Sequence, residues 1–244
     1  MAAIAAAAML TVGARPAQAG EYDLTAAGTT VTVDGVAIFS NTDNQSTGTG
    51  VINPFVRLSG NGDVIDGHNS GGRPLLNDEN SSPQFTTNLL LSALPVVNLG
   101  GTDYYEFLLD INQTGEDPLE SLDDVVICTS NTSDLLQANG CPSANVVYDL
   151  DDITDNWLKL NYNLNSGSGS GDLFMYIPTS LFGADTYVYL YSVFGTHYNN
   201  NDGFEEWAVR VAEGTVVPEP ATLLLFGIGL GGVARAARRR AKLA

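Results

Sequence analysis

The amino-acid sequence predicts an all-β protein: an antiparallel two-sheet β-sandwich, jelly-roll-like in its connections, followed by a C-terminal transmembrane helix. Three observations lead to this fold class. Several segments alternate between apolar and polar residues with the period of two that half-buried strands show. Clusters of Gly, Asn, Asp and Ser separate these segments, and no amphipathic helical repeat of ordinary length occurs. An uncharged apolar run followed by arginines ends the sequence.

The alternation is clearest at residues 104–111 and 157–164, where every second residue is apolar. Near the start, Asp34-Gly35 separates residues 30–33 from 36–39, which predicts a hairpin with a two-residue turn. The remaining strands are expected at residues 85–94, 122–129, 173–177, 187–194 and 204–211. Single helical turns are expected at residues 133–138 and 178–182.

The first 19 residues have the features of an export signal. Residues 4–12 are apolar and rich in Ala, and Ala17-Gln18-Ala19 is the small-x-small pattern that signal peptidase cleaves. We therefore expect residues 1–19 to be a signal peptide, cut between Ala19 and Gly20. The positively charged segment that normally begins such a signal is missing, so the true start is expected upstream of Met1.

Residues 218–244 contain three parts in unbroken order. Pro218-Glu219-Pro220 comes first, residues 221–234 form the apolar run, and a basic cluster follows. The cluster contains Arg235, Arg238, Arg239 and Arg240. As a helix the run would measure about 21 Å, against about 30 Å of hydrocarbon, so spanning needs help from flanking residues. Because arginines stay on the cytoplasmic side, the segment predicts a stop-transfer helix with its C-terminus inside.

This order of motif, apolar span and arginine cluster resembles the PEP-CTERM sorting signal of bacterial surface proteins. The resemblance implies that the Pro-Glu-Pro tripeptide is recognised by a membrane-embedded sorting enzyme, exosortase, which removes the tail. It also implies that the four arginines retain the chain end in the cytoplasm. The two prolines suit such a motif because their fixed φ keeps the tripeptide extended and outside the helix. The alternative is an ordinary tail anchor in which Pro-Glu-Pro is incidental.

Residues 20–217 form the expected exported domain, and their charge is strongly negative. This part contains 27 of the 28 acidic residues but only four basic ones, Arg57, Arg73, Lys159 and Arg210. Such a surface repels nucleic acid, so nucleic-acid binding is excluded, and it attracts cations or basic partners. We interpret the charge as a means of extracellular solubility, with specific cation binding as the alternative.

The only two cysteines, Cys128 and Cys141, lie close together in the sequence. In an exported chain such an isolated pair predicts a disulfide, which would clamp the end of the 122–129 strand. Closing a loop of this length stabilises the fold by about 3 kcal/mol in the chain-entropy model. A metal site at the cysteines is disfavoured because the two histidines, His68 and His197, are far away in sequence.

A calcium site is one hypothesis for the acidic middle of the chain. From Asp110 to Gly115, oxygen-bearing residues occupy positions 1, 3 and 5 of an EF-hand-like loop, with Gly at position 6. The glutamate expected at position 12 is absent, and the flanks are predicted strands. Candidate calcium ligands are Asp110, Asn112 and Asp117. The alternative is that these residues are solvated turn residues.

Two other segments could carry chemistry, and neither predicts an enzyme. Residues 63–69 bring Asp66, His68 and Asn69 into a Gly-containing loop, but no convincing nucleophile accompanies them. Glu205 and Glu206 are adjacent on a predicted strand, so they point to opposite faces and cannot act together on one glycosidic bond. Tyrosines at 187, 189, 191 and 198 could stack on a sugar or simply cover the sandwich.

These features together predict a non-enzymatic surface or extracellular-matrix protein. It would be exported, cleaved by signal peptidase, held briefly in the cytoplasmic membrane and processed by an exosortase-like enzyme, and would reside among exopolysaccharide. The alternative is a secreted carbohydrate-binding module or carbohydrate-active enzyme. Convergence of Asp66 and His68 with Glu205 or Glu206 would favour an enzyme, whereas an exposed row of Tyr and Trp would favour a binding module. No cofactor is expected apart from the calcium hypothesis.

Overall fold

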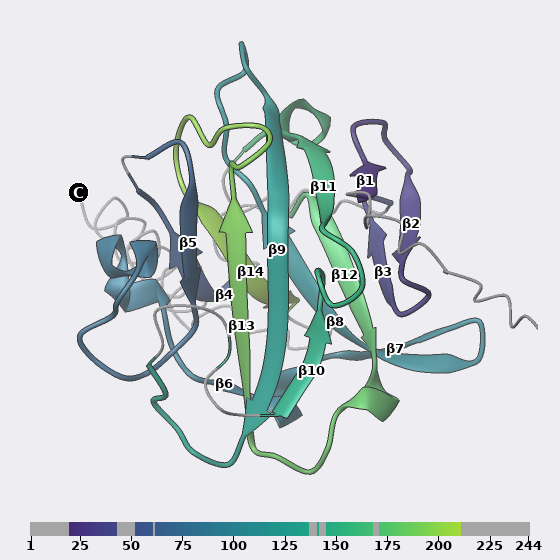
Figure 1. Ribbon diagram of the computed structural model, residues 1–244, viewed down its shortest axis with the longest axis vertical. Coiled ribbons are helices and arrows are strands. Elements are labelled where there is room, and N and C mark those ends of the chain that lie inside the picture. Colours follow the sequence, from purple (N-terminus) through teal and green to yellow (C-terminus); the bar gives the residue numbers. More distant parts are fainter. Residues whose placement is uncertain are drawn as a thin grey trace, which may run out of the picture. The chain divides into compact units, whose positions relative to one another are not determined.

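The structure is a computed structural model that describes residues 20–42, 52–60, 62–136, 141, 145–167 and 171–210 (Figure 1). The predicted signal peptide, its last residue Ala19, the Pro218-Glu219-Pro220 motif, the apolar run and the four tail arginines lie outside the described residues. In the part of the chain described, no helix is long and apolar enough to cross a membrane.

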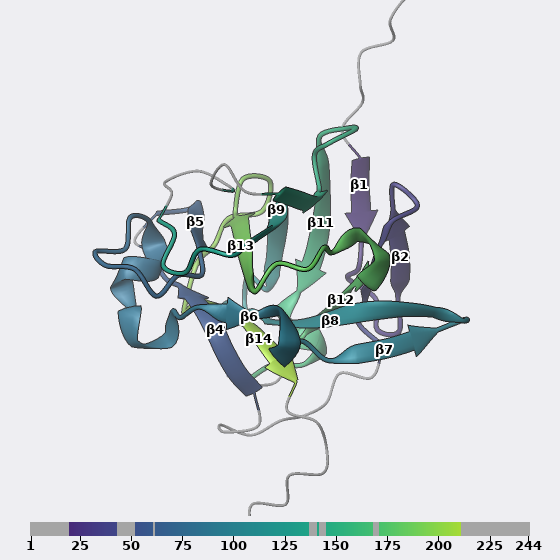
Figure 2. The ribbon, with the colours of Figure 1, turned by 90° about the horizontal axis from the view of Figure 1, so that it is seen from below.

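Two seven-stranded sheets make up the domain, and we call them sheet A and sheet B. Sheet A consists, in spatial order, of β1 (Gly20–Asp23), β11 (Asn156–Asn161), β9 (Leu119–Ser130), β13 (Tyr187–Phe194) and β5 (Ile65–His68). Two further strands lie off this path: β10 (Asn145–Asp149) pairs with β9, and β6 (Leu89–Leu90) pairs with β13. Sheet B consists of β2 (Thr30–Val33), β3 (Ala37–Ser40), β12 (Leu173–Pro178), β8 (Thr102–Asp110), β14 (Glu205–Arg210) and β4 (Ile52–Leu58), with β7 (Val96–Leu99) also pairing with β8. Figure 2 shows the sheets as two layers.

Within the described part of the chain, the strands pair antiparallel apart from the parallel pair of β1 and β11. The prediction of an all-β fold with two mostly antiparallel sheets is therefore confirmed. The Asp34-Gly35 hairpin is also present, since both residues have positive φ, 51° and 71°. The Val36 N–H donates to the Val33 carbonyl at 3.0 Å and closes the turn.

Some predicted elements are wrong. Residues 85–94 do not form one strand, because two 3₁₀ turns, η2 (Pro83–Phe85) and η3 (Leu91–Ala93), leave only β6 between them. The turn expected at 133–138 is not helical over the described residues 133–136, where Asp134 has a φ of +59°. The turn expected at 178–182 is present as η5 (Thr179–Leu181). The other 3₁₀ turns are η1 (Asp78–Ser81) and η4 (Tyr162–Leu164).

The core lies between the sheets and takes its side chains from alternate positions of the strands. On β8, for example, Phe107 and Leu109 are fully buried in this core. Trp207 of β14 is also fully buried, and its indole N–H donates to the Ser192 hydroxyl at 3.0 Å. Burying the ring therefore leaves no indole donor unsatisfied.

Candidate functional site

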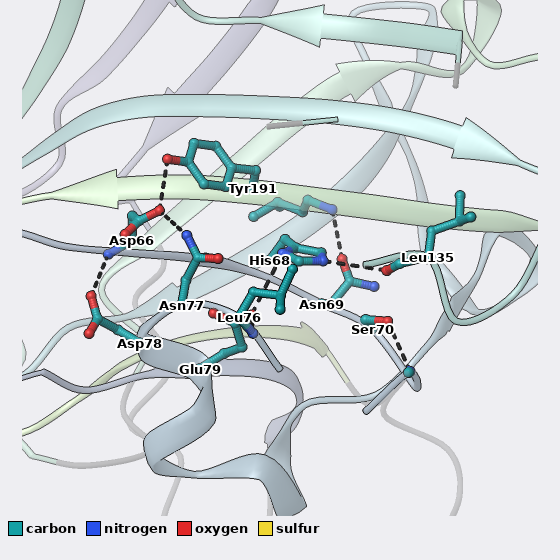
Figure 3. Close-up of polar contacts among 12 residues, drawn as sticks. Asp66, His68, Asn69, Ser70, Leu76, Asn77, Asp78, Glu79, Leu135 and Tyr191 are labelled. Carbon is teal, nitrogen blue, oxygen red and sulfur yellow. Dashed lines mark hydrogen bonds and ion pairs between the residues drawn. The ribbon is translucent and has the colours of Figure 1, made fainter. Parts of the chain in front are cut away.

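The predicted Asp66 and His68 pair is part of a polar network between β5 and η1 (Figure 3). His68 is almost fully buried, and its Nδ1 lies 3.7 Å from the Glu79 carboxylate, which is also buried. On its other side, the His68 Nε2 lies 3.4 Å from the Leu135 carbonyl oxygen. Gly67 makes this packing feasible, because a Cβ there would lie 2.3 Å from a Glu79 oxygen.

Asp66 extends the same network toward β13. The Tyr191 hydroxyl donates to the Asp66 carboxylate at 2.9 Å, and the Asn77 amide donates to the same oxygen. The Asp66 N–H donates to the Asp78 carboxylate at 3.0 Å. These bonds tie η1 to sheet A, so the geometry supports a structural role for Asp66.

Burial decides the protonation of this network. It lowers the pKa of His68 and raises the pKa of Glu79, in both cases chiefly through desolvation. Both shifts favour the neutral form of each group. The two side chains are buried, and the 3.7 Å between Nδ1 and the carboxylate exceeds hydrogen-bond distance, so the geometry shows packing rather than a shared proton.

Glu205 and Glu206 point to opposite faces of sheet B, as the sequence predicts for neighbours on a strand. Glu205 is fully buried and accepts hydrogen bonds from the Asn200 amide at 2.7 Å and the Asn112 N–H at 2.9 Å. Glu206 instead pairs with Arg57, whose Nη2 lies 2.6 Å from its carboxylate. The contacts of Asp66 and His68 belong to a separate network, so the structure does not bring these two predicted groups together.

The residues of the calcium hypothesis lie in different environments. Asp110 is fully buried at the end of β8, whereas Asp117 is exposed. The Asn112 amide nitrogen donates to the Phe204 carbonyl at 2.9 Å. Among the residues that the structure describes, no group of three or more His, Cys, Asp and Glu side chains is arranged to hold a metal ion.

Sequence reasoning missed a buried acidic cluster beside this loop, formed by Glu120, Asp172 and Glu205. The Asn200 amide bridges Glu120 and Glu205, at 3.0 and 2.7 Å, and the Ile111 N–H donates to Asp172 at 2.9 Å. A sequence signal existed for two of the members. Glu120 precedes the core residue Leu122 by two positions, and Glu205 precedes Trp207 by two, so both occupy inward positions of their strands.

Burial keeps this acidic cluster largely protonated. It raises the pKa of Glu120 to about 8, and the hydrogen bonds from Asn200 and Gln113 offset only part of the desolvation. The pKa values of Glu205 and Asp172 are also raised well above the ordinary range, first by burial and then by neighbouring carboxylates. The cluster is thus a group of mostly neutral acids held by amides.

A polar hollow of about 560 Å³ lies on the outside of this region. It is lined by acidic and amide residues together with glycines of neighbouring turns. The side chains with oxygen or nitrogen atoms are Ser59, Asp63, Asp117, Asn199, Asn200, Asn201 and Asp202. Such a lining can hydrogen bond to hydroxyl groups from several directions.

Tyr187, Tyr189 and Tyr191 of the predicted tyrosine row lie on β13, whereas Tyr198 lies beside the Trp157 ring. Tyr189 is buried, and its hydroxyl donates to the Thr132 carbonyl at 2.8 Å. Around it pack Val126 and Cys128, with Leu135, Cys141, Tyr187 and Tyr191 partly buried against them. Cys128 and Cys141 form the expected disulfide, with Cα atoms 5.9 Å apart. Thr132, Leu135 and Cys141 therefore contact this face, which matches the structural interpretation of the tyrosines on β13.

Comparison with known proteins identifies the end of the chain. Residues 216–240 match the family model of the PEP-CTERM protein-sorting motif. The chain carries a PEP-CTERM sorting signal. The sequence-based resemblance is thereby confirmed, and the signal indicates exosortase-dependent sorting of an exported protein to the cell surface. Neither the curated proteins nor the solved structures contain a significant match to the chain.

Proposed function

We propose that this chain is a non-enzymatic component of the extracellular matrix, released from its PEP-CTERM tail by an exosortase-like enzyme and retained among exopolysaccharide. The observation that carries the proposal is the sorting motif at 216–240, placed directly after a β-domain whose last described strand ends at Arg210. Through its strongly negative charge this domain would remain soluble outside the cell and attract cationic groups of the matrix.

Signal peptidase would release the other end of the domain, between Ala19 and Gly20. This cut would keep all of the described β1, since Gly20 is its first described residue and pairs with Asn156 of β11. A side chain at position 20 would clash, since a Cβ would lie 2.3 Å from the Asn156 amide oxygen.

Intact mass spectrometry of the protein from its native host, with and without the sorting enzyme, tests the proposal. We expect a mature species that begins near Gly20 and ends near Pro218 to Pro220 in the enzyme-containing strain. In the strain without the enzyme, the tail should remain. A species that keeps residues 223–244 in both strains would contradict the sorting part and indicate a plain membrane anchor.

Carbohydrate binding is the second candidate, and the polar hollow lined by Asp63, Asn199 and Asp202 favours it. Amide and carboxylate groups of this kind hydrogen bond to the hydroxyls of neutral sugars. Titration with neutral oligosaccharides from the host matrix checks this function. Asn199→Ala should weaken binding, while Asn98→Ala, at an exposed position of β7, should not. Equal binding by both variants would place the sugar elsewhere.

A further inference from the structure

A second hollow, of about 470 Å³, lies where the two sheets meet at one side of the sandwich. Sheet A contributes β10, sheet B contributes the turn between β2 and β3, and η5 contributes Leu181. Its volume falls within the range of small-molecule sites in proteins. The hollow is separate from the polar hollow, since the two share no lining residue.

The walls of this hollow are aliphatic and exposed. Val146, Ile153 and Leu181 line it, and their exposed fractions are 59, 65 and 43%. Large aliphatic side chains at such exposure lose the stabilisation that burial would give, about 25 cal/mol for each Å². Three of them around one hollow indicate an apolar ligand body that covers them.

Tyr148 forms part of the wall of the hollow, with its hydroxyl oxygen buried behind that wall. Its side chain lines the hollow and is 6% exposed, yet its hydroxyl has no hydrogen-bond partner among the described residues. The carboxylate that acts most strongly on this hydroxyl is Asp34, which lines the same hollow. Because the hydroxyl oxygen has less than 1 Å² of exposed surface, the part of Tyr148 that borders the hollow is not its hydroxyl.

The rim is negatively charged. Asp34, Asp149 and Asp152 all line the hollow. The four basic residues of the domain are engaged elsewhere, two with glutamates, Arg73 with backbone carbonyls and Lys159 over the Tyr198 ring. Carboxylates near the rim already repel one another. Burial, followed by the negative charges of Asp151 and Asp149, raises the pKa of Asp124 to about 7. A cationic ligand would relieve this repulsion.

From these observations we propose that the hollow between β10 and the β2–β3 turn is a binding site for a small aliphatic primary amine. The alkyl chain would cover Val146, Ile153 and Leu181. Its ammonium group would lie among the rim carboxylates Asp34, Asp149 and Asp152. The site is independent of the sorting function, because it needs neither the tail nor its processing.

Calorimetric titration of the full chain with n-pentylamine tests the site, with pentan-1-ol and methylamine as matched probes. The alcohol keeps the alkyl chain without the charge, and methylamine keeps the charge without the chain. Pentylamine should bind saturably and at least about tenfold more tightly than either. Absence of saturable pentylamine binding, or equal affinity for the amine and the alcohol, would overturn the proposal.

Variants locate the site. The double variant Asp149→Asn, Asp152→Asn should weaken pentylamine binding by about tenfold or more. Ile153→Ser should also weaken pentylamine binding, and it should not unfold the domain because Ile153 is exposed. The matched controls are Asp103→Asn and Leu99→Ser, at exposed positions on β8 and β7, which should bind as the parent does. If the controls and the site variants bind alike, the amine binds elsewhere. Binding of a lysine-containing peptide but not of pentylamine would replace the small amine with a peptide partner and overturn the proposal.

Discussion

Two groups of buried carboxylates in this domain are held in different ways. On the outer face of sheet B, Glu106 and Glu206 each face an arginine, with closest N–O distances of 2.5 Å to Arg210 and 2.6 Å to Arg57. Aromatic rings cover both guanidinium groups, since Arg57 lies over Phe85 and Phe204 and Arg210 over Phe174. In the buried acidic cluster of Glu120, Asp172 and Glu205, the donors are amides and backbone N–H groups.

The difference follows from how few bases the domain contains. Only four of the ten basic residues lie between residues 20 and 217, and two of them neutralise the outer face. The buried acidic cluster must then lower its charge by keeping protons, which the raised pKa values of its members express. The outer face should therefore contribute to the free energy of unfolding through its ion pairs. The contribution of the buried acidic cluster should instead depend on pH.

The largest effect is expected when an ion pair of the outer face is broken. Arg57→Met leaves Glu206, 3% exposed, buried without its cation. We expect the free energy of unfolding to fall by about 3–5 kcal/mol, the usual cost of removing one partner of a buried pair. Urea unfolding at pH 7 measures it. Lys159→Met removes a partly exposed ammonium that lies over the Tyr198 ring and has no ion-pair partner among the described residues, so it serves as the control and should lower the midpoint far less. Equal midpoints for the two variants would show that the outer face does not depend on its ion pairs.

Asn200→Asp should convert the amide-held cluster into one that depends strongly on pH. The new carboxylate would lie beside Glu120 and Glu205 and could no longer donate to them. We expect a loss of about 1–3 kcal/mol at pH 8 and a smaller loss at pH 5, where the acids share protons. Thermal unfolding at the two pH values checks this prediction. Asn98→Asp, which places an exposed carboxylate beside Asp103, is the matched control and should show little dependence on pH. A loss that is the same at both pH values would contradict the account.

Glu120→Gln should flatten the pH dependence of stability. The native pKa of Glu120 is about 8, against an ordinary value of 4.5, so the native state binds more protons than the unfolded state between these values. The free energy of unfolding must then fall as pH rises through this interval. Urea unfolding between pH 6.5 and 8 measures this slope above the range in which the lowered pKa of His68 contributes most. The slope that remains in the variant reports the other acids with raised pKa values, Asp124, Asp172 and Glu205. An unchanged slope in the variant would assign the pH dependence to other groups.

The smallest effect is expected where a carboxylate stays partly exposed. Tyr191→Phe removes the hydroxyl that donates to Asp66 at 2.9 Å, while the Asn77 amide still donates to the same oxygen. We expect a loss of about 1 kcal/mol, the usual net value of one hydrogen bond. Chemical unfolding at pH 7 measures it, and Tyr187→Phe, on the same strand, is the control. A loss as large as that of Arg57→Met would mean that the Asp66 network carries more of the fold than its exposure suggests.

Much of the fold was predictable from residues in local patterns. The segments 104–111 and 157–164 show the alternation that one buried face imposes. Residues 104–110 and 157–161 form strands as predicted, but residues 162–164 form the turn η4, so the second strand is shorter than its pattern suggests. The segment 85–94 is apolar enough for a strand, yet it wraps around the sheet edge in two 3₁₀ turns. Its conformation depends on contacts with β4 and β13, such as the bond from the Thr87 N–H to the Phe55 carbonyl. Such contacts carry no local sequence signature.

The sequence by itself determined the all-β class, the disulfide pair and the sorting signal at the C-terminus. Each of these depends on residues that are neighbours in the chain, so composition and spacing suffice to reveal it. Only the tertiary structure decided which charged residues meet. Glu205 lies 85 positions after Glu120, and Arg57 lies 149 positions before Glu206, so their contacts exist only after β9, β14 and β4 have packed. The hollow beside Tyr148 has the same origin, because its two sides come from different sheets.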